Sequence, residues 1–264
     1  MNLISPRVEG LIRQVANDII MPRFRNLNAA DIKEKSPGDL VTIADKESEL
    51  HLSEGLSYLM PHARVIGEEA TASDPSILDG INHGSTWLID PIDGTSNFAE
   101  GKSPFGVMIA LLNDGERMAG WMFDPIADRM CRAFAGGGAY VNGERITARE
   151  TGADLPLAAL AMHFLPTERR DDIERRAVGK FEIVPIPRCA AEQYPRLVLG
   201  QNDIALFERS LPWDHAAGAL FVAEAGGVVR RTDGSAYKIG DGRSGLIGAA
   251  SPRMWDKAAA ILFG

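Results

Sequence analysis

The sequence predicts a layered fold of helices and sheets, in the mixed α/β or α+β class. Apolar residues at helical spacing alternate with short apolar runs in both halves of the 264-residue chain. Three consecutive segments, residues 107–112, 117–123 and 129–134, have the composition of an antiparallel sheet. Each helix or sheet must bury its apolar side against another element, so we expect helices and sheets to stack in layers.

The composition excludes several classes of protein. Hydrophobic residues are 45% and charged residues 24% of the chain, close to the averages for soluble globular domains. The net charge of −8 argues against a nucleic-acid or membrane partner, because such surfaces are usually basic. The two cysteines, Cys131 and Cys189, exclude a disulfide framework and fit a reducing compartment. Without a leader-like N-terminus or an apolar run of membrane-spanning length, a cytoplasmic location is expected.

The first part of the chain, residues 1–150, is expected to lead from helices into a sheet. Its expected elements are a helix over 8–25, a loop over 33–39, an extended piece over 40–44, a helix over 46–60, a strand over 64–67, a polar loop over 71–85, a strand over 87–89 and the three strands above. Asn142-Gly143 follows a further strand and predicts a tight turn.

A loop over 147–156 leads into the second part, residues 151–264, which we expect to pack with the first as one compact unit. Its expected elements are strands over 157–162, 181–186, 204–207, 228–230 and 245–249, and helices over 168–176, 190–199 and 214–225. The last of these helices is predicted to have Asp214 as its N-cap and Gly226-Gly227 at its end.

Acidic side chains follow the predicted strands. Glu68 and Glu69 come after the strand 64–67, Asp90 and Asp93 come after the strand 87–89, and Asp214 begins a later helix. Carboxylates that converge repel one another and raise one another's pKa, and a divalent cation relieves this repulsion. An all-oxygen ligand set selects hard ions, Mg²⁺ above all.

The turn after Asp93 adds a second chemical feature. Gly94 permits a sharp turn, and Thr95 and Ser96 are expected in the first turn of a short helix, whose N–H groups attract an anion. Metal-binding carboxylates beside a phosphate-binding turn indicate metal-assisted hydrolysis of a phosphate ester. Thr95 would orient the attacking water, and Asp45 would accept its proton.

Each acidic feature also has a plainer interpretation when it is taken alone. Asp90-x-x-Asp93 is compatible with a turn, Glu68-Glu69 with a solvated pair and Asp214 with a helix cap. The joint occurrence of these features, after apolar strands and with the Gly-Thr turn, favours the catalytic interpretation.

Four segments together resemble the inositol monophosphatase family. Residues 87–98 (WLIDPIDGTSNF) resemble its first signature, and residues 212–218 (PWDHAAG), running on to 224–227 (EAGG), resemble its second. Residues 67–69 (GEE) and 39–45 (DLVTIAD) match two further family segments. The resemblance spans about residue 35 to the C-terminus. It implies a layered αβαβα sandwich of the inositol monophosphatase and fructose-1,6-bisphosphatase type, usually a homodimer.

The resemblance also implies a set of two to three Mg²⁺ ions. One ion would bind Glu68, Asp90 and the carbonyl of Ile92. A second would bind Asp90, Asp93 and Asp214, and a third, weaker ion would lie near Glu68. Inhibition by lithium is a further implication of the family.

For catalysis, the resemblance implies that Thr95 holds the attacking water, backed by Asp45 with help from Glu68 or Glu69. The implied contacts to the substrate are Asp93, Gly94, Thr95, Ser96, Ala190, Glu208 and Asp214.

The second part departs from the family pattern where the substrate alcohol is expected. Arg188-Cys189 stands before Ala190, where typical members have a Gly and a hydroxyl residue, and a thiol is a poor hydrogen-bond donor. Glu208 lies six residues before Asp214, where typical members have a spacing of seven. We therefore expect an intact hydrolytic centre and an altered pocket for the alcohol.

The sequence thus predicts a Mg²⁺-dependent phosphomonoesterase, an inositol-phosphate phosphatase that releases phosphate from inositol monophosphate by metal-activated water. The alternatives left open are the same chemistry on histidinol phosphate, fructose 1,6-bisphosphate or a 3′-phosphoadenosine nucleotide, and a regulatory protein of RNA-processing or transcription complexes. A metal-binding protein without turnover is disfavoured by Thr95 and Asp45, which such a protein does not need.

Three further residues near the predicted site have two interpretations each. His215 is interpreted as a surface or capping residue in preference to a substrate contact. Lys35 either approaches the phosphate or lies on the surface, and Arg188 either contacts a second anionic group or ends a strand.

Overall fold

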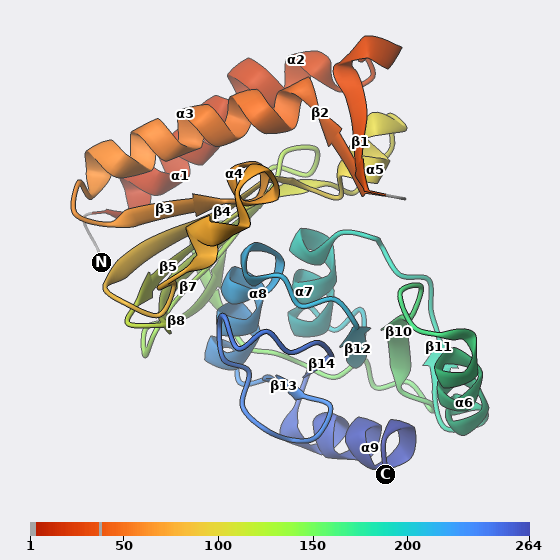
Figure 1. Cartoon of the computed structure of the whole chain (residues 1–264). Coiled ribbons are helices and arrows are strands. Elements are labelled where there is room, and N and C mark those ends of the chain that lie inside the picture. Colours follow the sequence, from red (N-terminus) through yellow and green to blue (C-terminus); the bar gives the residue numbers. More distant parts are fainter. Residues whose placement is uncertain (1–3, 37–38) are drawn as a thin grey trace.

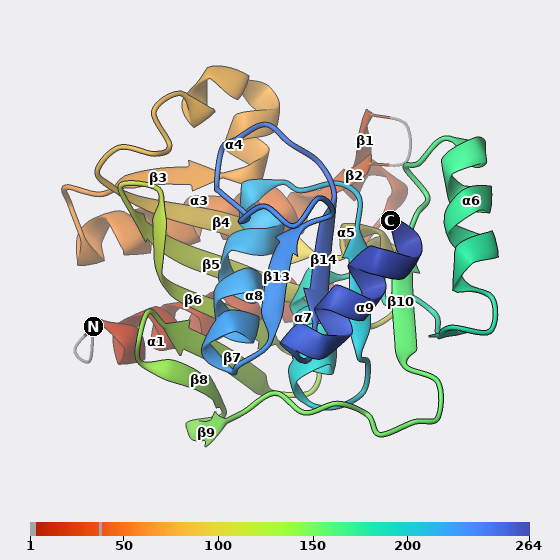
Figure 2. The same ribbon diagram turned by 90° about the horizontal axis from the view of Figure 1, so that it is seen from below.

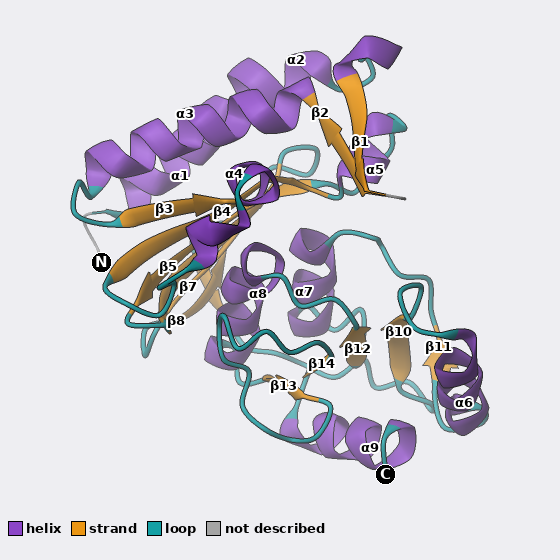
Figure 3. Cartoon of the chain, in the orientation of Figure 1, coloured by secondary structure: helices purple, strands orange, loops and turns teal. Residues whose placement is uncertain are grey.

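The computed structural model describes residues 4–36 and 39–264, and its helices and sheets alternate in αβαβα layers (Figure 1). The outer helices α1 (Ser5–Val15), α2 (Met21–Arg23) and α3 (Ile43–Leu59) cover one face of a seven-stranded sheet. Helices α7 (Ala190–Val198) and α8 (Pro212–Glu224) separate this sheet from a five-stranded one. Helices α6 (Thr167–Ala177) and α9 (Pro252–Leu262) form the last layer (Figure 3). The predicted layered fold is confirmed.

The seven-stranded sheet places two acidic residues side by side. Its order is β3 (Arg64–Gly67), β4 (Ser85–Asp93), β5 (Gly106–Asn113), β6 (Glu116–Asp124), β7 (Arg129–Phe134), β8 (Gly138–Val141) and β9 (Glu144–Ile146). Strands β3 and β4 are parallel, with Gly67 paired to Ile89. Because the residues after this pair are Glu68 and Asp90, the register itself brings the two carboxylates together.

The five-stranded sheet is mixed. Its order is β11 (Glu182–Ile183), β10 (Leu157–Ala161), β12 (Ile204–Phe207), β14 (Leu246–Ala249) and β13 (Val228–Arg231). Helix α9 crosses in front of this sheet in the view from below, and α6 lies beside β10 (Figure 2). The first sheet ends at Ile146 and the second begins at Leu157, so the predicted division of the chain at residue 150 lies in the connection between them.

The core explains why the layers hold together. Successive residues of β4 point to opposite faces, so Trp87 and Ile89 pack under the outer helices while Leu88 packs toward α7 and α8. The cluster on the α7–α8 side runs from Met108 of β5 to Leu246 of β14 and therefore joins the two sheets. Each fully buried large apolar side chain contributes about 1.5–3 kcal/mol to this packing.

The N-terminal helix differs from its prediction over 8–25. It begins at Ser5 and is divided into α1, a π-helical turn over Ala16–Ile20, and α2. Pro22 lies in the first turn of α2, where it has no N–H to donate and its ring would meet the carbonyl four residues earlier. The wider π turn directly before it accommodates the proline.

The second helix begins at Ile43, three residues earlier than predicted, because Thr42 caps it. The Thr42 hydroxyl accepts from the N–H groups of Ala44 (3.1 Å) and Asp45 (3.4 Å). In return the Asp45 carboxylate accepts from the N–H of Thr42 (2.8 Å). This capping box fixes Asp45 in the first turn of α3, with its side chain buried.

Two predicted loops contain regular structure. Strands β1 (Ile32–Ser36) and β2 (Asp39–Thr42) form an antiparallel pair over the predicted loop 33–39, of which residues 37 and 38 lie outside the described residues. The polar stretch 71–85 includes the end of α4 (Glu68–Ser73) and a 3₁₀ turn over Pro75–Leu78. Both were missed because these short elements bury little apolar surface and so show no periodicity.

Two further differences concern the second part. The strand predicted over 181–186 is reduced to the two residues of β11, since β10 pairs with it only at Glu182 and Ile183. Helix α9 was not predicted, although Ser251 caps it by accepting from the N–H of Met254. The remaining predicted strands and helices are confirmed, with shifts of up to four residues at their ends.

Close packing of β6 against α8 yields a test of this architecture. A Cβ at Gly120 would lie 2.7 Å from the Cα of Ala217, so Gly120→Ala should lower the free energy of unfolding by about 1–3 kcal/mol. The control is Gly10→Ala in α1, where a Cβ meets nothing within 4 Å and should stabilise by about 0.5–1 kcal/mol. Urea unfolding of both variants measures the difference, and equal stability would contradict the described contact.

Candidate active site

A cleft with a volume of about 220 Å³ lies where the two parts of the chain meet. Its residues come from the ends of β3, β4, β10 and β12, from the turn before α5 (Thr95–Ala99), and from the N-termini of α7 and α8. Most of the sequence-predicted site residues line it: Glu68, Asp90, Ile92, Asp93, Gly94, Thr95, Ser96, Ala190, Glu208 and Asp214. Asp45 and Glu69 lie directly behind this wall, as their contacts below show.

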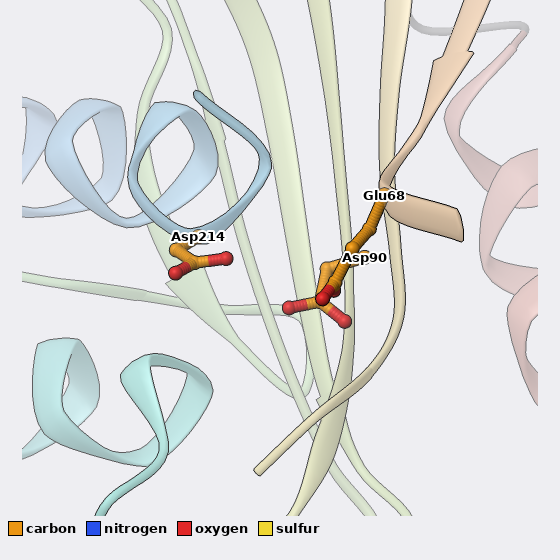
Figure 4. Close-up of side chains that lie close together, drawn as sticks. All are labelled: Glu68, Asp90 and Asp214. Carbon is orange, nitrogen blue, oxygen red and sulfur yellow. The ribbon is translucent and has the colours of Figure 1, made fainter. Parts of the chain in front are cut away.

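Three carboxylates converge at the floor of the cleft. One oxygen from each of Glu68, Asp90 and Asp214 lies within 4.8 Å of the others (Figure 4). Glu68 begins α4 directly after β3, Asp90 lies in β4, and Asp214 comes from the first turn of α8. The predicted N-cap role of Asp214 is wrong: Pro212 starts the helix, with Leu211 as the N-cap, and the Asp214 carboxylate points toward Asp90.

Burial and mutual repulsion raise the pKa values of this cluster. Burial raises the pKa of Asp90 well above its usual range, and the charges of Glu68, Asp93 and Asp214 raise it further. The pKa of Asp214 is raised by the same kind of burial and by Glu68 and Asp93. The donor set is composed of carboxylates, without His or Cys, and fits a hard divalent cation that would offset the repulsion.

Asp93 connects the two parts of the chain. Its Oδ2 accepts from the N–H of Ala191 at 2.5 Å, in the first turn of α7, and the Cys189 thiol donates to the Asp93 carbonyl at 3.7 Å. Burial raises the pKa of Asp93 to about 6, and the α7 N–H groups oppose that rise. Asp93, at the end of β4, is therefore held by the first turn of α7, which belongs to the second part of the chain.

Thr95 and Asp45 are in direct contact. The Thr95 hydroxyl lies 3.1 Å from Asp45 Oδ1 and 2.9 Å from the carbonyl of Ile92, and its single proton is donated to one of them at a time. The other Asp45 oxygen accepts from the Thr42 hydroxyl at 2.5 Å. Burial raises the pKa of Asp45 to about 7, while the bonds from Thr42 oppose the rise.

Gly94 makes the sharp turn that was predicted. Its φ of 84° lies in the left-handed region, and α5 begins at the next residue. A Cβ at Gly94 would lie 3.1 Å from the carbonyl of Pro104 and 3.2 Å from the Cβ of Cys189. The position therefore needs glycine both for its conformation and for the closeness of the second part.

Lys35 belongs to the site and not to the open surface. Its ammonium donates to Glu68 Oε1 at 2.7 Å and to Glu69 Oε1 at 2.8 Å. Burial lowers the pKa of Lys35, but the charges of these two glutamates outweigh it and leave the pKa above its usual value. Burial raises the pKa of Glu69, and Lys35 opposes that rise.

Glu49 is a buried acid that the sequence analysis missed. Its carboxylate accepts from the N–H groups of Glu69 (2.7 Å) and Ala70 (2.8 Å) and so holds the first turn of α4 in place. Burial raises its pKa to about 7, against those two bonds. Its signal was its spacing, because Glu49 lies one helical turn after Asp45 on the same buried face of α3.

In the second part, Ala190, Glu208 and His215 all line the cleft, but they differ in exposure and in their bonds. Ala190 and the half-buried Glu208 line the cleft, and Glu208 Oε1 accepts from the Ser244 hydroxyl at 3.4 Å. His215 is only 3% exposed, which corrects its interpretation as a surface or capping residue. Its ring nitrogens lie 2.8 Å from the Tyr194 hydroxyl and 2.8 Å from the Arg209 carbonyl. Burial lowers its pKa to about 4, so it is neutral at pH 7.

Comparison with known proteins identifies the family to which this chain belongs. The sequence model described as the inositol monophosphatase family matches residues 7–262. The chain belongs to that family. It is 30% identical to the inositol-1-monophosphatase of Bacillus subtilis, over 83% of this chain and 82% of that protein. It is 32% identical to the Nus factor SuhB of Escherichia coli, over 90% of this chain and 88% of that protein.

Solved structures support the same assignment. An IMPase from Thermotoga maritima has a TM-score of 0.82 and 25% identity, and the match covers 99% of this chain and 97% of that one. Family membership assigns a phosphatase activity to the chain, and the acidic cluster gives it a place for metal. Among residues 4–36 and 39–264, no helix combines the length and apolar character needed to cross a membrane.

The raised pKa of Glu49 predicts how stability depends on pH. The folded state holds the Glu49 proton up to about pH 7, whereas the unfolded chain loses it near 4.5. This contribution to stability is therefore complete below pH 4.5 and is lost as the pH rises toward 7. In chelator, the loss of unfolding free energy between pH 5 and pH 8 should be about 2 kcal/mol smaller in Glu49→Gln than in the wild type.

Urea unfolding at the two pH values provides this measurement. The control is Glu54→Gln on the exposed face of the same helix, which should leave the wild-type pH dependence in place. If Glu49→Gln and Glu54→Gln behaved alike, Glu49 would titrate as an ordinary exposed acid.

Proposed function

We propose that this chain is a Mg²⁺-dependent phosphomonoesterase that hydrolyses a small phosphate ester with metal-activated water, with inositol monophosphate as the first substrate to test. The observation that carries the proposal is the contact between Thr95 and Asp45 at the edge of a three-carboxylate cluster. A metal store needs the cluster alone, whereas hydrolysis also needs a group that orients water and a group that takes its proton.

The residues at the floor fit two to three Mg²⁺ ions. We assign Glu68, Asp90 and the carbonyl of Ile92 to one ion, and Asp90, Asp93 and Asp214 to a second, with a weaker ion near Glu68. When bound, the metal supplies an activated water and neutralises the phosphate charge. Inhibition by lithium is part of this proposal, because it accompanies the second ion's site in the family.

The chain's own groups then control the proton. With its hydroxyl proton directed to Asp45, Thr95 presents a lone pair to a water molecule and fixes its position. The proton passes from the water through Thr95 to Asp45, whose pKa of about 7 suits an acceptor at neutral pH. We assign to Glu69 or Glu68 an assisting role in the activation of this water. The phosphate lies on the N–H groups of Gly94, Thr95 and Ser96.

The alcohol of the ester lies toward the second part of the chain. We assign Ala190, Glu208 and Asp214 to its binding, together with Asp93. Cys189 stands where a hydroxyl would contact inositol, and its thiol is occupied by the Asp93 carbonyl. Histidinol phosphate, fructose 1,6-bisphosphate and 3′-phosphoadenosine 5′-phosphate therefore stay alternatives to inositol 1-phosphate.

A second candidate function follows from one comparison. The 32% identity with the Escherichia coli protein named as a Nus factor supports a role in transcription complexes. The net charge of −8 disfavours direct binding of nucleic acid, so such a role would act through proteins. We propose a cytoplasmic homodimer with phosphatase activity, and light scattering of the purified protein tests its assembly state.

Replacement of Asp93 tests the metal-assisted reaction. Asp93→Asn keeps the volume and removes a charge from the cluster. The kcat should therefore fall at least about 100-fold on each of four esters: inositol 1-phosphate, histidinol phosphate, fructose 1,6-bisphosphate and 3′-phosphoadenosine 5′-phosphate. Chelator should abolish wild-type phosphate release, and added Mg²⁺ should restore it. The control Asp128→Asn removes the same charge from an exposed turn and should retain full activity. Undiminished turnover by Asp93→Asn would refute the proposed mechanism.

Two substitutions at Thr95 separate its hydroxyl from its shape. Thr95→Ala removes the group that positions water and should lower kcat by about 10²–10⁴. Thr95→Ser retains the hydroxyl and should keep kcat within about tenfold of the wild type, with KM nearly unchanged in both variants. Steady-state phosphate release measures these values, and equal kcat values for the two variants would exclude the hydroxyl from the reaction.

A further inference from the structure

The mouth of the cleft carries positive charge, in contrast to its acidic floor. His163, Arg188 and Arg209 line this mouth and are exposed, and we call them the cationic rim. The charges of Arg188 and Arg209 add to burial in lowering the pKa of His163, as expected for three side chains that line one cleft. Phe164 joins them with 55% of its surface exposed.

Arg188 is held in a backbone conformation that is unfavourable for arginine. Its φ of 54° lies in the left-handed region, where a non-glycine residue costs about 1 kcal/mol or more. Typical members of the family have a glycine at this point of the motif, whereas this chain has an arginine. Strain that a smaller residue would remove is a sign that the side chain itself is used.

The backbone around Arg188 is fixed beside the proposed phosphate turn. Asn97 of α5 donates to the carbonyl of Pro187 at 3.0 Å and to the carbonyl of Pro104 at 2.7 Å. The Cys189 thiol donates to the carbonyl of Asp93. The guanidinium of Arg188 therefore extends from a rigid point next to Gly94, while its own end stays in solvent.

Arg209 and Phe164 form the opposite side of the rim. The Arg209 guanidinium lies 5.2 Å from the centre of the Phe164 ring, and its Nη1 lies 3.5 Å from Asp39 Oδ2. The His163 ring lies 4.1 Å from the Phe164 ring. At 3.5 Å, Asp39 satisfies the guanidinium only loosely, and Arg209 retains donors for a ligand.

The acidic groups near the rim are Asp39, Glu100 and Glu208, and the charge of Asp214 on the floor also acts on Arg209. Glu100 pairs with Lys102 at 2.7 Å, and Glu208 accepts from Ser244. Two arginines therefore meet one loosely paired carboxylate at the cleft mouth. The single phosphate of a monoester belongs at the metal floor, and a neutral polyol has no group that matches two guanidinium ions.

We propose that the alcohol of the true substrate carries a second phosphate group, which Arg188 and Arg209 bind at the rim while Phe164 packs against the substrate's ring. This inference rests on the proposed phosphatase function and specifies its substrate class. In the reaction, water oxygen bonds to the floor phosphorus, the bond from phosphorus to the alcohol oxygen breaks, and the alcohol takes a proton. The second phosphate is unchanged and serves only for binding.

Matched ligand pairs test the rim without requiring turnover. Adenosine 3′,5′-bisphosphate is compared with adenosine 3′-phosphate, and fructose 1,6-bisphosphate with fructose 1-phosphate, by titration calorimetry in Mg²⁺ buffer. All proteins carry Thr95→Ala, which slows hydrolysis and leaves the rim intact. We expect at least one bisphosphate to bind about tenfold or more tightly than its monophosphate, as for charge-assisted bonds to phosphate.

The variants assign that preference to residues. Arg188→Gly removes the guanidinium and relieves the positive φ, so the fold is retained, and the bisphosphate preference should fall about fivefold or more. Arg209→Gln should have a similar effect, and the control Arg7→Gln on α1 should have none. If the Phe164 ring packs on a flat base, Phe164→Leu should lower the affinity for the two adenosine ligands more than for the two fructose ligands. If it packs on a sugar, the affinity for both pairs should fall equally.

The outcomes separate the two proposals. The bisphosphate preference is the Kd of the monophosphate divided by the Kd of the matching bisphosphate. A ratio near one for both pairs, absence of binding by every ligand, or a ratio that both arginine variants retain would overturn the anionic subsite. If the wild-type protein released no phosphate from any ester while the preference still depended on Arg188 and Arg209, the hydrolytic proposal would fail and the subsite would stand.

Discussion

The repulsion among buried carboxylates is the constraint on which this structure depends. Glu68, Asp90 and Asp214 approach one another in a region where burial already raises the pKa of Asp90 and Asp214. Like charges in such a place destabilise the folded state, so the surrounding layers must offset the cost. The apolar clusters on both faces of the seven-stranded sheet supply that stabilisation. A site that is unfavourable for the empty protein is favourable for a divalent cation.

The precision of the site comes from ordinary backbone features. The parallel register of β3 and β4 sets Glu68 beside Asp90, the capping box of α3 fixes Asp45, and the bond from Ala191 to Asp93 aligns the second part with the first. Glu68, Asp45 and Asp214 lie in the first turn of a helix, Asp93 ends β4 and Asp90 lies within β4, so none of them is on a free loop. Such positions keep reacting groups within the small tolerances that catalysis needs.

The sequence predicted the layers, most elements and the clustering of the acids, because apolar periodicity and strand-end position are local properties. It also predicted Asp214 as the N-cap of α8, which was wrong, since Pro212 and Asp214 are both good starting residues and only packing decides between them. Glu49 was missed, and the interpretation of His215 as a surface or capping residue was wrong. Both side chains bond to backbone groups whose positions only the folded chain sets, Glu49 to the N–H of Glu69 and His215 to the carbonyl of Arg209.

The acidic floor and the positively charged mouth of the cleft therefore have different roles. Negative groups at the floor select a cation and, through it, a phosphate, and this selection is the same for any phosphate ester. Discrimination among esters must come from groups that meet the alcohol, and this chain departs from the motifs of the family there, at Arg188, Cys189 and the shortened Glu208 segment. Arg188 lies on a different segment from Glu68, Asp90 and Asp214, so its side chain can change without replacing a residue of the acidic cluster. Arg188, exposed and held at a φ of 54° beside Cys189, is the residue on which the proposed second-phosphate subsite depends most.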